Sequence, residues 1–269
     1  MAPPDTSRLS AREIFERVSS DARDELGRPP SALAFSALFA GLAMGLSGLG
    51  VAAALTVLGS GPGAEFVASM LYPIGFLAVI LGRAQLFTEN TLYPVALILA
   101  ERRHLLATAR LWIIVFTGNV LGALLFAVLA VKSGALDANF AGEIAHLGKG
   151  LVEADFSTNF WSGVFGGWII ALVAWLVAAS HWTIGQFFVI YALTFLVGIG
   201  RFDHCIASAG EALAAVVAGE MGVGTFLTWL AAATLGNIVG GVGIVALLNY
   251  AQVASGDGPP PTGSESAAA

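Results

Sequence analysis

The sequence of 269 residues is poor in charge, since only 11% of its residues are Asp, Glu, Lys or Arg, whereas 57% are hydrophobic. Soluble domains carry about 25% charged residues, so a soluble protein of this composition would lack the polar groups needed to cover its surface. The apolar excess predicts an integral membrane protein. The formal net charge of −6 argues against a basic face for nucleic acid.

Cysteine is nearly absent, because Cys205 is the only one. An internal disulfide is therefore excluded, and no redox compartment is implied. The first thirty residues are polar and charged, so we see no cleavable signal peptide in them. We expect the first hydrophobic segment to direct insertion into the membrane.

Residues 1–30 predict a cytoplasmic arm that contains one amphipathic helix. Ser10 and Glu13 have the spacing of a capping box. An apolar stripe follows at every fourth residue: Ile14, Val18, Ala22 and Leu26. Pro29 and Pro30 then end the helix. Two interpretations stay open, a helix that lies on the membrane surface or on its own protein, and a mobile gate over a pore mouth.

Six hydrophobic stretches are long enough to cross a bilayer, which needs about 20 apolar residues per helix. They are Ser31–Leu58, Glu65–Glu101, Leu111–Lys132, Phe160–Ser180, Ile184–Gly219 and Val223–Tyr250. Polar residues and glycine interrupt the second and the fifth, and each of these is too long for one plain span. We assign residues 31–250 to a transmembrane channel domain and expect disorder in the Gly-, Pro-, Ser- and Ala-rich tail, 251–269.

The positive charges predict the orientation of the chain, because cytoplasmic connections carry an excess of Lys and Arg. One side would hold Arg8, Arg12, Arg17, Arg23, Arg28, Arg102, Arg103 and Arg110. The other side would hold only Lys132 and Lys149. Both termini are therefore expected in the cytoplasm, in a multi-pass protein of a bacterial-type inner membrane.

The two halves of the channel domain, about 31–134 and 160–250, resemble each other. In each half a run that begins with Phe interrupts a long segment and a GN-x-x-G motif follows: FTEN at 87–90 and GNVLG at 118–122, then FDHC at 202–205 and GNIVG at 236–240. Three spans per half predict inverted repeats, a design of channels and secondary transporters. Broken helices survive at membrane depth where they line a cavity or are buried in protein, so we expect the two interruptions to meet near a pore.

Ionisable residues at membrane depth are functional candidates by default. Those in or near the interruptions are Arg83, Glu89, Arg201, Asp203, His204 and Glu211. We expect Arg83 to compensate Glu89, and Arg201 to compensate Asp203 or Glu211. His204 changes charge near neutral pH; burial favours its neutral form, whereas a carboxylate or an arriving anion favours the imidazolium. We interpret it as a pore residue that attracts or briefly protonates a weak-acid anion, and the alternative is a histidine that only hydrogen-bonds a helix end.

Thr88 offers a hydroxyl and a helix-end N–H to the oxygen atoms of an anion, unless it only caps its own helix. Asn119 and Asn237 occupy matching positions in the two halves. We expect one of them to bond the backbone of a broken helix, and Asn237 to reach His204. Apolar residues beside the interruptions are candidates for constrictions that exclude water, or for ordinary packing: Leu86, Phe87, Val197 and Phe202.

Three runs of the sequence resemble the formate–nitrite transporter family: GRAQLFTENT at 82–91, FDHCI at 202–206 and GNIVG at 236–240. The run ELGRP at 25–29, followed by SAL at 31–33, is similar to a subgroup with FTEN at the first broken helix. The resemblance covers about residues 20–250. It implies an aquaporin-like fold of six transmembrane helices, a homopentamer with one pore in each protomer, and transport of formate, nitrite or similar small monovalent anions.

The motif match also implies roles for single residues. The family's pore residues fall on Thr88, His204 and Asn237, and its constriction residues on Leu86 and Phe87. This chain departs from the family pattern at Arg83, Glu89, Val197 and Asp203. These departures bear on the substrate more than on the fold.

Other functions are compatible with parts of the sequence. The run GLSG at 45–48 has the GxSG form of rhomboid proteases, but Gly and Ser in a first span are common helix-packing residues. A channel for water or small neutral solutes and a non-conducting membrane scaffold are the two alternatives to an anion channel. We expect the partners to be a small anion, lipid and further copies of the chain, and we expect no enzyme activity, cofactor, metal or nucleic acid.

Overall fold

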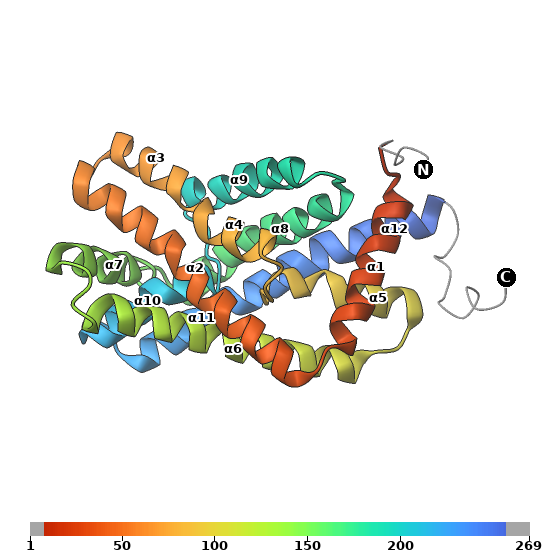
Figure 1. Cartoon of the computed structure of the whole chain (residues 1–269), viewed down its shortest axis with the longest axis horizontal. Helices are drawn as coiled ribbons and strands as arrows, with labels where there is room; N and C mark the ends of the chain where they lie inside the picture. The colour runs from red at the N-terminus through yellow and green to blue at the C-terminus, as the bar shows by residue number, and fades with distance from the viewer. Residues whose placement is uncertain (1–7, 257–269) are drawn as a thin grey trace.

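A computed structural model describes residues 8–256, which form helices joined by short connections, with no strand among them. Figure 1 shows the helices side by side in an elongated bundle. In chain order they are α1 (Ala11–Gly27), α2 (Pro30–Leu58), α3 (Pro62–Leu71), α4 (Pro73–Leu81), the 3-10 turn η1 (Glu89–Thr91), α5 (Tyr93–Glu101), α6 (Leu105–Lys132), α7 (Ala138–Gly150), α8 (Phe156–Ala179), α9 (Thr183–Gly200), α10 (Ala207–Ala218), α11 (Val223–Ile238), the π-helical segment η2 (Val239–Ala246) and α12 (Leu247–Gly256).

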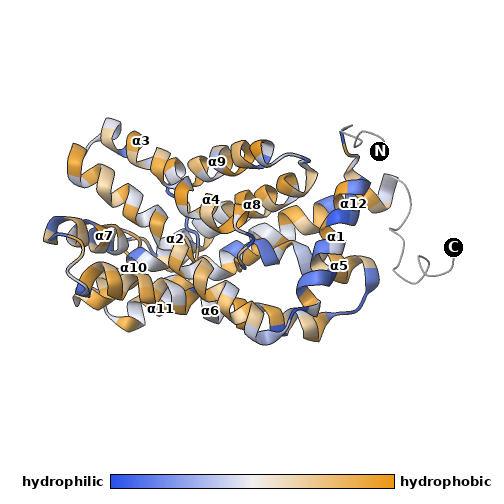
Figure 2. Ribbon diagram, viewed as in Figure 1, coloured by the Kyte–Doolittle hydropathy of each residue, from blue (hydrophilic) through white to orange (hydrophobic). Residues whose placement is uncertain are grey.

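Six stretches of the described chain are long and apolar enough to span a membrane. They are α2, α3 with α4, α6, α8, α9, and the continuous helix α11–η2–α12. Hydrophobic residues predominate along these helices in Figure 2, whereas α1 carries several hydrophilic positions. The predicted all-helical membrane fold, with its second and fifth segments broken, is confirmed.

The two broken segments end in the same way. Helix α4 is followed by Arg83, with φ 56°, and α9 is followed by Arg201, with φ 51°. The amide of Arg83 bonds the carbonyl of Ile80, and that of Arg201 bonds the carbonyl of Gly198. In both cases the next amide reaches back five residues, which completes a Schellman motif. Helices α5 and α10 resume the two segments after the interruptions.

Glycine permits the closest helix contacts, and these contacts repeat between the halves. Helix α2 packs along α6, and α8 packs along α11 and η2. A Cβ atom at Gly122 would overlap the carbonyl oxygen of Leu38, and one at Gly240 would overlap the carbonyl oxygen of Val164. The two GN-x-x-G motifs therefore hold equivalent helix pairs at backbone contact.

The serine of the GLSG run supports a bend. Proline at position 73 has no N–H, so the helix is interrupted between α3 and α4. Ser47 is buried, donates from Oγ to the Tyr72 carbonyl at 2.6 Å, and accepts from the Gly75 amide at 3.2 Å. This role fits helix packing and leaves the hydroxyl engaged.

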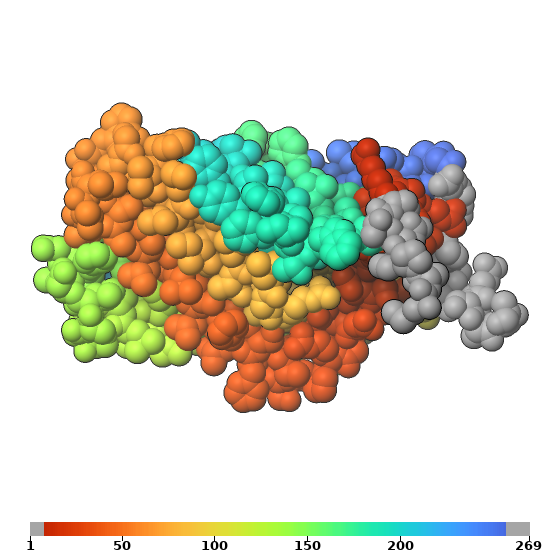
Figure 3. Space-filling view, turned by 45° about the horizontal axis from the view of Figure 1, so that its top comes forward, coloured from red at the N-terminus to blue at the C-terminus, as the bar shows by residue number. Residues whose placement is uncertain are grey.

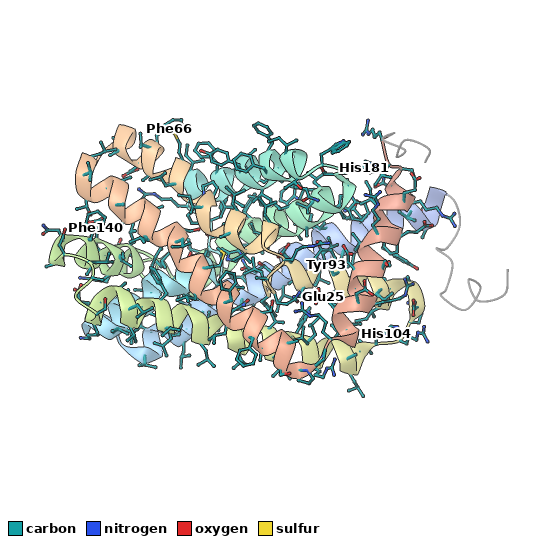
Figure 4. The ribbon with its side chains drawn as sticks, in the orientation of Figure 1. Glu25, Phe66, Tyr93, His104, Phe140 and His181 are labelled. Carbon is teal, nitrogen blue, oxygen red and sulfur yellow. The ribbon has the colours of Figure 1, made fainter. Side chains whose placement is uncertain are left out.

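The bundle has two different ends. We call the end with α1, α5 and α12 the α1 end, and the end with α3 and α7 the α7 end (Figure 1). In Figure 4, His104 and His181 lie toward the α1 end, and Phe66 and Phe140 lie at the α7 end. Helix α12 continues to Gly256, so residues 251–256 are helical where we expected disorder, and residues 257–269 lie outside the described residues.

Helix α1 lies on the protein body. It begins with the predicted capping box of Ser10 and Glu13. Its apolar side packs against α5, α8 and the α11–η2–α12 helix through Phe15 and Val18, which are fully or almost fully buried. The space-filling view in Figure 3 shows α1 beside α12 at one end of the molecule. Of the two interpretations left open, the structure shows contact with the protein, and the gate stays a prediction.

Candidate functional site

The two interruptions meet in the middle of the bundle. Thr88 Oγ1 lies 2.7 Å from His204 Nε2, and both side chains are completely buried. Thr88 comes from the first interruption and His204 from the second, 116 positions apart in the sequence. The structure therefore joins two residues that the sequence analysis had selected separately.

The surroundings of His204 favour one tautomer. The amide of Ala207 donates to His204 Nδ1 at 2.9 Å. Because Nδ1 accepts this bond, the proton of a neutral imidazole lies on Nε2, which can then donate to Thr88 Oγ1. Phe76 stands edge-on to the imidazole, with ring centroids 5.0 Å apart, and is fully buried. The histidine thus has one hydrogen bond on each nitrogen and an apolar ring at its side.

Asn119 and Asn237 hold the two interruptions open. Asn119 Oδ1 accepts from the Phe87 amide at 2.9 Å, and Asn237 Oδ1 accepts from the Cys205 amide at the same distance. Each Nδ2 then donates to two carbonyls, one in its own half-loop and one in the neighbouring long helix, namely Gln85 and Ala37 for Asn119, and Asp203 and Gly163 for Asn237. Both asparagines bond backbone, and Asn237 does not bond His204, contrary to our expectation.

These bonds also correct the alignment of the repeats. The donor precedes the asparagine by 32 residues in both halves, so Phe87 is equivalent to Cys205. The predicted match of the two runs that begin with Phe aligns Phe87 with Phe202 and gives unequal separations of 31 and 34 residues to the GN-x-x-G motifs. In the corrected register Arg83 matches Arg201, and Gln85 matches Asp203.

The charged residues near the interruptions do not pair as expected. Arg201 is exposed and forms an ion pair with Glu65 at 2.8 Å, so the expected pair with Asp203 or Glu211 is wrong. No ion pair joins Arg83 to Glu89 within 4.0 Å. Glu89 opens η1 and is 8% exposed.

Asp203 is tied to the second interruption by its backbone and side chain. Its amide donates to Ser162 Oγ at 2.8 Å, and its Oδ1 accepts from Trp229 Nε1 at 3.1 Å. The sequence analysis missed Trp229, which only tertiary folding brings beside the loop. Phe76 was also missed, because an aromatic residue in a hydrophobic segment gives no signal of its own.

The four constriction candidates lie in different surroundings. Leu86 and Val197 are at most 1% exposed. Phe87 contacts Trp112 and Phe116 of α6 edge-on. Phe202 stacks on Phe165 of α8, with ring centroids 5.0 Å apart. The role of all four residues in gating stays a prediction.

A cavity of about 1070 Å³ enters the bundle from the α7 end. Val197, Phe202 and Asp203 are among the residues that line it, whereas Thr88 and His204 do not line it. The pair of Thr88 and His204 is therefore closed off from this cavity in the structure.

Comparison with known proteins identifies the family that this chain resembles. A family model described as "Formate/nitrite transporter" matches residues 12–251. The chain is 32% identical over 254 residues to the inner membrane protein YfdC of Escherichia coli, covering 93% of this chain and 81% of that protein. It is 30% identical over 208 residues to a probable formate transporter of Methanothermobacter thermautotrophicus, covering 69% and 74%.

Solved structures share the fold. A structure titled "FNT family ion channel" superimposes with a TM-score of 0.81 at 18% identity, covering 89% of this chain and 98% of that one. A structure titled "Pentameric formate channel with formate bound" gives a TM-score of 0.71 at 17% identity, covering 83% and 97%. The chain is a multi-pass membrane protein that belongs to the formate/nitrite transporter family.

Proposed function

We propose that this protein is a channel or transporter for small monovalent weak-acid anions such as formate or nitrite, with His204 at the centre of its path. The single observation that carries the proposal is the 2.7 Å contact between Thr88 Oγ1 and His204 Nε2, where two broken helices meet inside six spans. Irregular backbone and a titratable side chain at membrane depth are expensive to bury, and such features accompany transport paths. Membership of the family supports the same function.

The site has the chemistry to handle such an anion. Helix α10 begins at Ala207, so its positive end and the Nε2–H of His204 lie in the same interruption. An anion that replaces Thr88 as the acceptor of that N–H would be surrounded by apolar groups such as Phe76. The Nε2–H of His204 and the positive end of α10 attract the anion, and loss of water raises the proton affinity of a carboxylate or nitrite. A brief protonation of the anion requires that His204 first takes up a second proton from solvent and becomes an imidazolium.

The chain's setting in the membrane is part of the proposal. Of the ten cationic residues outside the two breaks, eight lie on the α1 side, which supports a cytoplasmic position for the α1 end and both termini. The E. coli relative bears the name of an inner membrane protein, which supports the same membrane here. Residues 87–90, FTEN, support assignment to the subgroup with that motif.

A homopentamer with one pore per protomer completes the proposal. The pentameric formate channel with a similar fold supports this assembly. Large apolar side chains are exposed along α9, including Ile184, Phe188 and Leu196, and α9 lies beside α3 and α4 at the surface in Figure 3. Lipid or neighbouring protomers would cover this surface.

The test is uptake of formate and of nitrite into proteoliposomes across an imposed pH gradient. We expect uptake above that of empty liposomes, rising as the outside pH falls, and almost complete loss of uptake in His204→Phe. The matched control is His181→Phe, which changes an exposed histidine between α8 and α9 and should keep normal uptake. Normal uptake by a folded His204→Phe protein would refute the role of His204. No uptake of either anion by folded wild-type protein would favour the neutral-solute channel or the non-conducting scaffold, and osmotic swelling of the same liposomes separates these two.

A further inference from the structure

The cavity at the α7 end is acidic, which is unexpected in a path for anions. Five carboxylates line it: Glu65, Glu143, Glu153, Asp203 and Glu211. The basic side chains on its wall are Arg201 and His146, and Arg201 is already paired with Glu65 at 2.8 Å. A cleft lined by one sign of charge concentrates ions of the opposite sign and depletes ions of the same sign. The wall therefore favours cations.

Two of these carboxylates lie at the buried floor of the cavity. Asp203 is 4% exposed and Glu211 is 7% exposed. The Asp203 carboxyl group interacts with the side chains of Trp229 and Ser162, whereas the Glu211 carboxylate makes no hydrogen bond or ion pair with any residue that the structure describes. A Cβ atom at Gly48 would lie 2.9 Å from Glu211 Oε1, so the glycine leaves the space that the carboxylate occupies.

The floor contains a second buried group without a partner. Tyr72 is 7% exposed and lines the same cavity, and its hydroxyl makes no hydrogen bond of normal geometry. Ser208 lies close to it on the same floor. Buried polar groups are almost always paired, so the unpaired Tyr72 hydroxyl and the unpaired Glu211 carboxylate on the lining of one cavity point to a ligand there.

We propose that this floor binds one small monovalent cation, ammonium or an alkali metal ion, between Asp203 and Glu211. The hydroxyls of Tyr72 and Ser208 add neutral oxygen ligands, which hard cations prefer. A site for a divalent ion would need more charged ligands, and no group of three or more His, Cys, Asp or Glu side chains suited to a metal ion occurs between residues 8 and 256. The bound cation offsets the charge of the wall, which lets an anion enter; this consequence rests on the proposed function, whereas the binding itself does not.

Cation binding is tested on the purified wild-type protein in detergent, without transport. Sodium, potassium or ammonium chloride replaces N-methyl-D-glucamine chloride at constant ionic strength, while thermal unfolding and tryptophan fluorescence are followed. Trp229, which bonds Asp203, is the internal reporter. We expect a saturable response to at least one of the three small cations, and their ranking distinguishes ammonium from the alkali ions. A response equal to that of N-methyl-D-glucamine in all three cases would overturn the proposal.

Variants locate the cation. Glu211→Gln keeps the size of the side chain and should raise the Kd about tenfold or more, because it removes a charged ligand. Tyr72→Phe should raise the Kd by a smaller factor. Glu153→Gln removes the same charge from an exposed position on the cavity wall and should leave the Kd nearly unchanged. Equal changes in Kd for Glu211→Gln and Glu153→Gln would show that the negative charge of the whole cavity attracts the cation and that no specific site binds it.

The two proposals fail separately. His204→Phe should lose anion uptake and keep cation binding, because His204 does not line the cavity. Anion uptake by wild-type protein that binds no cation would retain the proposed function and refute the cation site. Cation binding without anion uptake would retain the site and refute the proposed function.

Discussion

Buried polar side chains at the interruptions have two distinct tasks. Asn119 and Asn237 use both ends of their amides on the backbone. Each satisfies one N–H and one carbonyl group that the broken helix leaves free, and each also donates to a carbonyl of a neighbouring long helix. Thr88 and His204 bond each other, which leaves them able to exchange that bond for one with a substrate. The asparagines therefore maintain the shape of the interruptions, and in the proposed function the threonine–histidine pair is the part that meets the substrate.

Asn237→Ala should destabilise the protein strongly. The change leaves the Cys205 amide and the Asp203 carbonyl unpaired in the interior, and it also removes a bond to the Gly163 carbonyl within α8. A buried unsatisfied group costs about 1–3 kcal/mol, so we expect a loss of at least about 2 kcal/mol, measured as a lower midpoint of thermal unfolding in detergent. The control is Asn249→Ala, which removes one bond to the Val245 carbonyl and should cost about 1 kcal/mol. Equal midpoints for the two variants would contradict this account.

At the level of helices, the halves share more than their motifs. Both broken helices end in a Schellman motif whose left-handed residue is an arginine, Arg83 or Arg201. A non-glycine residue with positive φ is uncommon, and nothing in the sequence around these arginines indicates it. Close packing of the GN-x-x-G helices then fixes the distance between the long helices in each half.

Gly240→Ala should force α8 and η2 apart. The added methyl group would overlap the Val164 carbonyl and approach the Trp168 amide, both of which are backbone and cannot move aside. Overpacking of this kind costs about 1–3 kcal/mol, and the lower unfolding midpoint should be accompanied by reduced uptake. Gly243→Ala lies in the same segment, where a Cβ atom meets nothing within 4 Å, and should behave as wild type. If the Gly240→Ala variant has the unfolding midpoint and the uptake of the wild type, the helices adjust freely and this account is wrong.

Across the whole molecule, the two ends carry opposite chemistry. The α7 end holds the acidic cavity. At the α1 end, arginines anchor the N-terminal helix: Arg110 donates to the Leu26 carbonyl at 2.7 Å, and Arg23 donates twice to Glu101. The amphipathic helix is thereby fixed to the body.

Glu101→Gln should loosen α1. Burial alone would raise the pKa of Glu101, but hydrogen bonds from His104, Arg23 and Arg103 outweigh it and lower the pKa to about 2. Because the folded pKa lies below the unfolded one, this cluster stabilises the docked helix above about pH 4.5, and the contribution is lost as the pH falls toward 2.

The measurement is the rate of limited proteolysis within α1. It should rise in Glu101→Gln at pH 7, and an acid-stable protease should show the same rise in the wild type as the pH is lowered below about 4.5. Glu16→Gln, which removes an exposed pair with Arg12, is the control and should leave the rate unchanged. Unaltered cleavage of Glu101→Gln would mean that apolar packing of Phe15 and Val18 holds α1 without the charges.

Local patterns in the sequence were sufficient for the membrane class, the six spans, the broken second and fifth segments and the capping box of α1. They also singled out Thr88 and His204, whose role stays a prediction. Each of these depends on the composition or spacing of residues within one segment, where hydrophobicity and propensity act directly. The contacts between segments depended on folding: the register that pairs Phe87 with Cys205, the partner of Arg201, and the acidic floor under Tyr72. Such contacts are set by distances between helices, and residues far apart in sequence give no local signal of them.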